Sequence, residues 1–500
     1  MSPNRWTTLL VLGLLAACER TTPQPPTIYS FTAAPATIRS GETSTLAWGV
    51  TGAAGLTLEP GIGDVVGSSA FVVGPGMTTT YTLTATNRGG SRNAHATVTV
   101  DDTIVVDGHV LGLDGLPAAE VQVFVHAVGG DRTDAAGAFS VEGVSLPYDV
   151  TAIYPDEFLT VTYRGLTLAQ PTLLLPGLPP GIRHGVAVSG TVSGGTQFPQ
   201  PSRHRTVAAF GSDATRVSVE VDAATGAFAI DPLVWFGPDT EGALHALQWR
   251  TDAAGLPVEY IGHGYRELTL RTSDSEHRFQ DIALQPVSGA RMDGLVAWPD
   301  GYGLLVQSLV LQYPEGGTTI LAARLWPSST FDYATPLIDR TTFALATVAN
   351  SEAGETSFAV RSGLSASASG VLATLASAPR LAAPAAGATA VGHDTEFQWA
   401  GPADSAYVVA FVGPADQPTY AVVTHETRVT IPDLSAFGIA LPAGVSYEWR
   451  VYGLPQYLSV DAAASDDDGF LSSWFLNTFY RARRDGALTE SVARPFVTGP

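Results

Sequence analysis

The sequence predicts an all-β protein, a tandem array of β-sandwich domains behind a short N-terminal segment that is cleaved off. Short runs of β-branched and aromatic residues alternate with Gly, Pro, Asp and Asn turns at close spacing, as is typical of sandwiches. No stretch after the N-terminal segment has the pattern of a long amphipathic helix. A chain of 500 residues is also too long for one hydrophobic core, so we expect several domains.

The composition disfavours several classes of protein. The chain has 47 acidic and 26 basic side chains, which give a net charge of −21, and it contains no Lys, so every basic residue is Arg. Without Lys there can be no P-loop lysine, no Schiff-base lysine and no kinase-type ATP lysine. The strong negative charge opposes binding through phosphate neutralisation, so we expect no nucleic acid among the partners.

The first eighteen residues have the pattern of an export signal. Arg5 precedes an apolar run, residues 9–17, which ends in small residues. This run is too short to span a bilayer as a helix. Cys18 follows it directly and is the only cysteine of the chain. We therefore expect residues 1–17 to be a signal peptide and the mature protein to contain no disulfide.

The tetrad Leu15-Ala16-Ala17-Cys18 resembles the bacterial lipobox. The resemblance implies that Cys18 carries a diacylglycerol and usually an N-acyl chain such as palmitate, so the membrane becomes a partner through lipid. Two or three acyl chains anchor a protein stably. Residues 18–26 would then be the lipidated Cys and a Pro-rich tether. The residue after Cys18 is not Asp, which in the enterobacterial pattern indicates the outer membrane of the cell envelope. The alternative is an ordinary secretory signal with an incidental Cys.

Residues 27–100 are the first candidate domain. Tyr81, Leu83 and Ala85 alternate with threonines, which predicts a strand with one buried face. The segment resembles a bacterial immunoglobulin-like domain, and this resemblance implies a fold only. The residues that carry it are Phe31, Pro35, Gly41, Leu46-Ala47-Trp48 and Thr80-Tyr81-Thr82-Leu83.

Residues 103–180 open with the run Val106 to Val110, and alternating valines follow. Asp134 and Gly137 are expected to form a turn, after which Phe139 starts a strand and enters the core. The segment resembles the carboxypeptidase regulatory-like domain, a small transthyretin-like sandwich that is also grouped with carbohydrate-binding-like folds.

The opening pattern of this domain recurs twice. Val188 to Val192 and Met292 to Val296 repeat it, with a central glycine each time. Residues 184–285 are therefore expected to form a related β-sandwich, and residues 286–375 a diverged one.

Residues 381–500 form the last expected domain. Tyr447, Trp449 and Val451 alternate inward in a late strand, and Phe397 and Trp399 share a face. The segment resembles a fibronectin type III domain. Residues 456–490 depart from that pattern as a long insertion between the last two strands.

The sequence contains three possible metal sites, and none of them matches a known metal-binding motif well. His393 and Glu396 have the His-x-x-Glu spacing of zinc carboxypeptidases, but an extended strand points them to opposite faces. Asp466-Asp467-Asp468 fails the pattern of an EF-hand loop and is expected to be a solvated acidic loop. A Ca²⁺ ion held there or by Asp101 and Asp102 stays an open alternative. We expect no metal and no cofactor.

Five aromatic residues within the insertion form a candidate ligand patch, followed by three arginines. One interpretation is a helix or strand packed on the sandwich. The other is an exposed patch that binds a glycan or an envelope protein. The patch residues are Phe470, Trp474, Phe475, Phe479 and Tyr480.

The sequence shows no convergent nucleophile, base and orienting group, so we do not expect an enzyme. The expected function is that of a non-catalytic, lipid-anchored cell-envelope protein in surface adhesion, scaffolding or ligand binding. One alternative is carbohydrate binding by the transthyretin-like domains or the aromatic patch at 470–480. Another is an accessory subunit of a separate envelope hydrolase.

Overall fold

The computed structural model describes residues 24–112, 115–154, 159–175, 183–196, 203–402, 404–465, 470 and 484–499. The chain divides into two compact units, residues 1–103 and 104–500. Almost all regular structure in the described residues is β-strand, and their only α-helix, α1 (Val460–Ala464), has five residues. No helix of the described residues is long and apolar enough to cross a bilayer. The predicted all-β array of sandwiches is confirmed.

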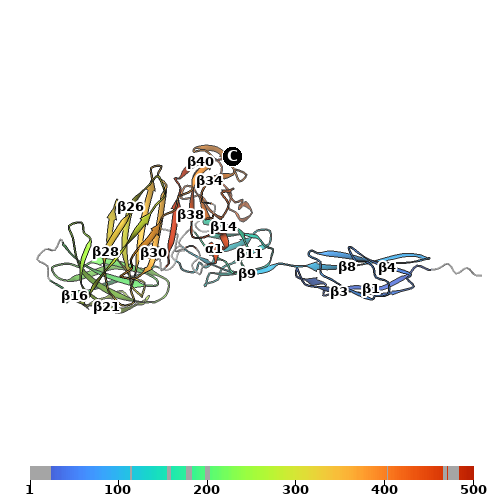
Figure 1. Ribbon diagram of the computed structural model, residues 1–500, viewed down its shortest axis with the longest axis horizontal. Helices are drawn as coiled ribbons and strands as arrows, with labels where there is room; N and C mark the ends of the chain where they lie inside the picture. Colours follow the sequence, from blue (N-terminus) through green and yellow to red (C-terminus); the bar gives the residue numbers. More distant parts are fainter. Residues whose placement is uncertain are drawn as a thin grey trace, which may run out of the picture. The chain divides into compact units, whose positions relative to one another are not determined.

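The first sandwich lies in the first unit and packs two sheets around Leu46, Trp48 and Leu83. One sheet has the order β1-β3-β6 and the other β2-β8-β7-β4-β5 (Figure 1). The strand predicted around Tyr81 is β7. The strands are β1 (Thr27–Ala34), β2 (Thr37–Ile38), β3 (Ser44–Thr51), β4 (Gly55–Glu59), β5 (Gly63–Asp64), β6 (Ala70–Val73), β7 (Thr79–Asn87) and β8 (Gly90–Val100).

The second sandwich has seven strands. The first strand is central in one sheet, β12-β9-β15, and pairs in parallel with the last. The other sheet has the order β11-β10-β13-β14. The predicted turn is present, because Gly137 donates its N–H to the Asp134 carbonyl and Phe139 is buried. The strands are β9 (Ile104–Leu111), β10 (Gln122–Val125), β11 (Gly129–Arg132), β12 (Ala138–Val144), β13 (Tyr148–Tyr154), β14 (Leu159–Leu166) and β15 (Thr172–Leu174).

The third sandwich repeats this plan, with sheets β19-β16-β22, to which β23 adds, and β18-β17-β20-β21-β24. The equivalent turn forms between Asp222 and Gly226. The strands are β16 (Arg183–Ser193), β17 (His204–Ser212), β18 (Arg216–Glu220), β19 (Ala227–Phe236), β20 (Thr240–Thr251), β21 (Pro257–Leu270), β22 (Glu276–His277), β23 (Ile282–Ala283) and β24 (Gln285–Pro286).

The fourth sandwich follows the same plan, with the sheet β28-β25-β31 facing the strands β30-β29-β26-β27. The sequence repeat around the glycines therefore corresponds to a repeated strand topology. The strands are β25 (Gly289–Ala297), β26 (Tyr302–Gln312), β27 (Thr318–Leu325), β28 (Thr330–Pro336), β29 (Thr342–Ser351), β30 (Thr356–Leu364) and β31 (Val371–Thr374).

The glycine of the repeat has the same structural role in each copy. On the neighbouring antiparallel strand it faces a buried phenylalanine, and a further strand runs alongside in parallel. A Cβ on Gly108 would lie 2.4 Å from Phe139 Cζ, so the ring occupies the space that a side chain would fill. The three pairs are Gly108 with Phe139, Gly190 with Phe228 and Gly294 with Phe331.

The fifth sandwich has a three-stranded sheet, β32-β34-β37, facing β36-β35-β38-β40. The expected insertion lies between β38 and β40, and its described part contains α1 and β39. The strands are β32 (Arg380–Ala383), β33 (Ala388–Val391), β34 (Phe397–Ala400), β35 (Ala406–Val412), β36 (Thr419–Thr424), β37 (Arg428–Val429), β38 (Ser446–Leu454), β39 (Gly486–Glu490) and β40 (Arg494–Thr498).

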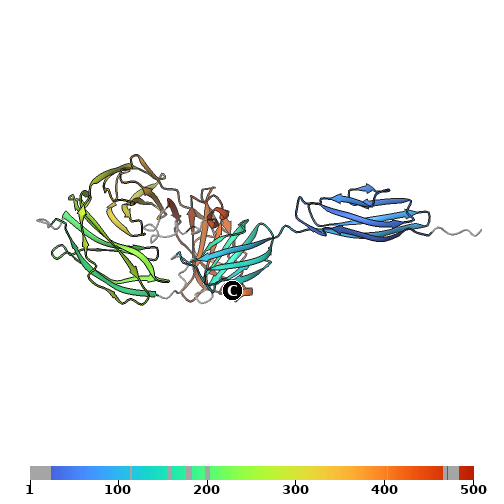
Figure 2. The same ribbon diagram turned by 90° about the horizontal axis from the view of Figure 1, so that it is seen from below.

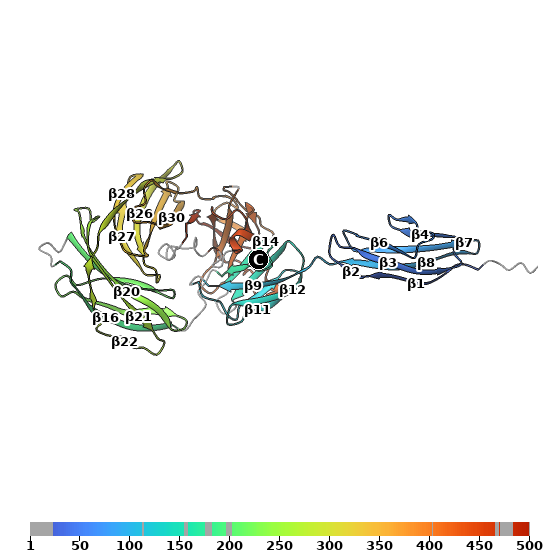
Figure 3. The same ribbon diagram turned by 60° about the horizontal axis from the view of Figure 1, so that its bottom comes forward.

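The fifth sandwich is joined to two others by strand pairing. β36 pairs in parallel with β14 of the second sandwich, with Thr162 opposite Val422. β39 pairs with β30 of the fourth sandwich, with Phe358 opposite Leu488. One continuous sheet of 14 strands therefore runs through three sandwiches. The fifth sandwich lies between the second and the fourth, as Figures 2 and 3 also show.

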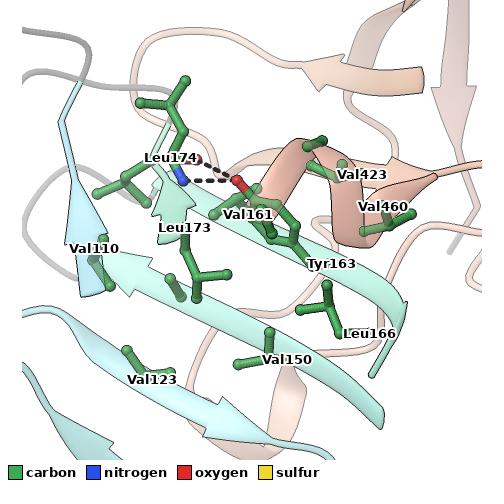
Figure 4. Close-up of a cluster of buried hydrophobic side chains, with 14 of the residues drawn as sticks. Val110, Val123, Val150, Val161, Tyr163, Leu166, Leu173, Leu174, Val423 and Val460 are labelled. Carbon is green, nitrogen blue, oxygen red and sulfur yellow. Dashed lines mark hydrogen bonds between the residues drawn. The ribbon is translucent and has the colours of Figure 1, made fainter. Parts of the chain in front are cut away.

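The hydrophobic cores are shared in the same way. The core of the second sandwich includes Val423, Val460 and Phe470 from the last 120 residues of the chain. At its centre Tyr163 is fully buried, and its hydroxyl accepts a hydrogen bond from the Leu174 N–H at 2.7 Å (Figure 4). The third and fourth sandwiches share a second core that contains aromatic residues of both.

Candidate functional site

Most of the predicted site residues lie outside the described part of the chain. These are Cys18, Trp474, Phe475, Phe479 and Tyr480. The acidic run Asp466 to Asp468 lies outside it as well.

Phe470 is described, and it is not part of an exposed patch. Its side chain is 2% exposed and its ring centroid lies 6.4 Å from that of Tyr163. Of the two interpretations of this stretch, packing therefore holds for Phe470, because the core of the second sandwich buries its ring, and an exposed ligand patch does not include this residue.

The other two candidate metal sites, Asp101 with Asp102 and His393 with Glu396, are hydrogen-bonded to other groups of the protein. Asp101 accepts hydrogen bonds from the backbone and hydroxyl of Thr103, which hold the pKa of Asp101 below its usual value. Asp102 accepts one from the Ser40 N–H. In the other pair, His393 bonds the Ile431 carbonyl while Glu396 bonds Arg428. No group of three or more potential metal ligands occurs among the described residues.

A pocket of about 500 Å³ lies where the third and fourth sandwiches meet. We call it the histidine pocket, after the two imidazoles in its wall. The third sandwich contributes strands β20, β21 and β24, and the fourth contributes the β26–β27 turn and the loop before β29. The lining residues are His245, His263, Tyr265, Glu267, Gln285, Pro286, Val287, Pro314, Glu315, Leu337, Ile338, Asp339, Arg340 and Thr341.

Strand geometry brings the polar residues of the third sandwich together. His263, Tyr265 and Glu267 are at alternate positions of β21, so they share one face of the sheet. In the antiparallel register, His245 of β20 lies opposite Tyr265. This face is the one that the fourth sandwich approaches.

The turn that carries Glu315 is held firmly against the third sandwich. Arg216 donates a hydrogen bond from Nε to the Gly316 carbonyl at 2.7 Å. The backbones also approach closely, since a Cβ on Gly211 would lie 1.9 Å from Gly317 Cα. Glycine is needed at Gly211 for this contact, and the contact fixes the position of Glu315.

Two hydrogen bonds link Glu315, His245 and His263. His245 Nε2 lies 3.0 Å from Glu315 Oε2, and His245 Nδ1 lies 3.2 Å from His263 Nε2. A carboxylate accepts, so His245 carries its proton on Nε2 and leaves Nδ1 as an acceptor when the ring is neutral. His263 must then donate from Nε2. Its Nδ1 is left with a free lone pair, and no hydrogen bond joins it to another described residue.

Burial keeps both imidazoles neutral. Removal from water lowers the pKa of His245, against the opposing effect of Glu315. Burial also lowers the pKa of His263 to about 4, helped by the neighbouring His245. Aromatic rings add to the packing: Tyr313 stacks on His245 with centroids 3.8 Å apart and planes 9° apart. The pocket therefore presents a neutral imidazole nitrogen near pH 7.

The neutral histidines predict a stability loss in mild acid. The folded chain resists protonation of His263 until about pH 4, whereas the unfolded chain takes up that proton near pH 6.5. The free energy of unfolding therefore does not depend on this group above pH 6.5, and it decreases as the pH falls from 6.5 towards 4, because unfolding then takes up a proton. We expect the free energy of unfolding to drop by about 1–2 kcal/mol between pH 7 and 5, allowing for the partial exposure of the ring.

Denaturant unfolding of the protein at pH 7 and pH 5 measures this drop. The variant His263→Asn should show a smaller drop than the unchanged chain, whereas His425→Asn, at an exposed position, should leave it unaltered. Equal drops in all three proteins would contradict the prediction.

Six charged or titratable groups surround the two histidines. Tyr265, Glu267, Glu315, Asp339 and Arg340 line the pocket, and Tyr313 stacks on His245.

The pocket is rich in hydrogen-bond acceptors and carries net negative charge. Glu267, Glu315 and Asp339 face it with a single cation, Arg340. Tyr265 presents a ring that is 62% exposed, roughly parallel to that of His263 with an angle of 14° between the planes. An exposed aromatic ring with carboxylates and a neutral imidazole suits a ligand that carries several hydrogen-bond donors and an apolar face.

A larger pocket of about 660 Å³ lies on the second sandwich, and several of its charged groups are paired with one another or with nearby hydroxyl and N–H groups. Asp107 accepts a hydrogen bond from the Ser140 hydroxyl, and Asp131 accepts one from the Ser140 N–H. Arg132 bonds Glu120. The histidine pocket combines a chain of hydrogen bonds between buried and half-buried groups with an exposed aromatic ring, so it is the stronger candidate.

Sequence reasoning missed the histidine pocket. Glu315 is 70 residues from His245 and belongs to another sandwich, so no local spacing joins them. A signal did exist in β20, where His245 interrupts a run of apolar residues and is 4% exposed. A polar residue in such a run requires a partner.

No protein-family model matches this chain, and no curated protein matches it. Among solved structures, the Bacillus anthracis TIE protein is 9% identical, with 70% of this chain and 74% of that chain covered and a TM-score of 0.20. The fimbrial anchor protein Mfa2 from Porphyromonas gingivalis is 13% identical, with 35% and 78% covered and a TM-score of 0.14. The major pilin subunit BcpA of Bacillus cereus is 8% identical, with 55% and 99% covered and a TM-score of 0.13. The all-β class is shown by the strand pairings themselves.

Proposed function

We propose that this chain is a non-catalytic cell-envelope lipoprotein that acts at the cell surface as an adhesion, scaffold or ligand-binding protein. The single observation that carries the proposal is the lone Cys18 at the end of a lipobox-like tetrad. Lipid on Cys18 would attach the protein to the membrane, with the outer membrane as the expected location, and residues 19–26 would serve as a tether.

The described residues support a binding role for the folded part. Sandwich scaffolds usually bind ligands with their loops and strand edges. The histidine pocket is lined in part by two such loops, the β26–β27 turn and the loop before β29. Its lining contains three carboxylates and two imidazoles but no Ser, Cys or Lys, and the hydroxyl of Thr341 donates to the Ile338 carbonyl rather than to these groups.

Membrane attachment is tested by processing in a bacterial host. The unchanged protein should fractionate with membranes and accumulate as an unprocessed precursor when globomycin blocks the lipoprotein signal peptidase. The variant Cys18→Ala should lose both properties. Unchanged processing and membrane fractionation of Cys18→Ala would overturn the anchor.

A further inference from the structure

We propose that the histidine pocket is a saccharide-binding site that takes a neutral or amino sugar. This inference extends the ligand-binding part of the proposed function to a particular site and ligand class. It does not depend on the lipid anchor, because every residue it uses belongs to the folded third and fourth sandwiches.

The first argument is the pattern of acceptors. Sugar hydroxyls are donors arranged around a rigid ring, and they require acceptors with fixed positions. Glu315 is fixed by its bond to His245, and the same chain of hydrogen bonds fixes the proton of His263 on Nε2. The free lone pair of His263 Nδ1 is therefore preorganised to accept from a hydroxyl.

The second argument is the aromatic wall. The ring of Tyr265 is 62% exposed, although its centroid lies only 5.7 Å from that of the buried His245. Its orientation is held by stacking with the two imidazoles, at interplanar angles of 22° and 14°. An exposed ring of fixed orientation offers a flat apolar surface to the C–H face of a pyranose. Pro286, Pro314 and Leu337 extend the apolar lining.

The third argument is charge and size. With neutral histidines, Glu267, Glu315 and Asp339 outnumber Arg340, so an acidic sugar would meet repulsion. Hydroxyl and ammonium donors are favoured instead. A volume of about 500 Å³ is within the range of small-ligand sites and accommodates one or two sugar rings.

The test is a binding measurement on the purified protein at pH 7. Glucose, glucosamine, N-acetylglucosamine and their β-1,4-linked oligomers are the probes, with glucuronic acid as the acidic comparator. We expect at least one neutral or amino saccharide to bind and glucuronic acid not to bind. Tyr265→Ala and Glu267→Gln should each weaken the binding at least tenfold, since both residues are exposed and their replacement leaves the core intact.

Phe279→Ala is the matched control, because Phe279 is an aromatic residue of the same sandwich that is 78% exposed and does not line the pocket. It should leave the affinity unchanged. Three results would each overturn the site: no binding of any neutral or amino saccharide, binding that survives both pocket substitutions, or glucuronic acid binding as tightly as the neutral sugars. Because the assay uses soluble protein, failure of the saccharide site leaves the Cys18 anchor untouched, and failure of the anchor leaves the site untouched.

Discussion

A chain that ends at residue 379 is expected to lose the folded state of the second sandwich. This truncation removes β36 and β39, which leaves β14 and β30 as bare strand edges. It also removes part of the core around Tyr163, so apolar side chains of the second sandwich become exposed to water. The removed core residues are Ala406, Val408, Ala421, Val423, Leu454, Tyr457, Val460, Ala463, Ala464, Phe470 and Leu488.

Limited proteolysis with mass spectrometry measures this effect. In the truncated chain, residues 104–175 should be cleaved rapidly, while residues 24–103 stay protected because the first sandwich has its own core. The complementary variant is a chain that begins at residue 104 and lacks the first sandwich. Its four described sandwiches should all remain protected from the protease. Equal protection of residues 104–175 in the truncated and the complete chain would show that the shared core is not needed.

Gly294→Ala is expected to destabilise the fourth sandwich by about 2–3 kcal/mol, as overpacking of a well-packed core does. A Cβ there would lie 2.1 Å from the Val371 carbonyl oxygen and 2.6 Å from Phe331 Cζ. The carbonyl belongs to a paired strand, so it cannot move without breaking the parallel register between β25 and β31.

Gly303→Ala in the same sandwich is the matched control. A Cβ at Gly303 would have no heavy atom within 4 Å, so the substitution should be neutral or slightly stabilising. Denaturant midpoints of the two variants and the unchanged protein give the comparison. A midpoint for Gly294→Ala equal to that of Gly303→Ala would refute the overpacking argument.

The sequence was sufficient to predict the all-β class and the local features of the repeats. The Asp134–Gly137 turn, the buried Phe139 and the inward-facing Trp449 follow from turn chemistry and strand alternation, which act over a few residues. The repeated glycines were visible as a pattern, but their role became clear only in the structure, where each faces a phenylalanine on a neighbouring strand.

Long-range pairing could not be predicted in this way. Parallel strands β14 and β36 are separated by about 260 residues, and no local spacing in the sequence joins two strands so far apart. The sequence left the position of Phe470 open for the same reason, because the core that buries it belongs to a different sandwich. The histidine pocket was missed since its residues come from two sandwiches.

The pairing of β14 with β36 also governs the order in which the sandwiches can fold as the chain is synthesised. The first sandwich is complete once about a hundred residues have emerged, so it can form early. The second sandwich must wait until the last part of the chain is available, because the strand that covers its edge strand β14 and part of its core come from there. Until then its unpaired strand edge is open to wrong partners, and protection by chaperones would matter most in that interval.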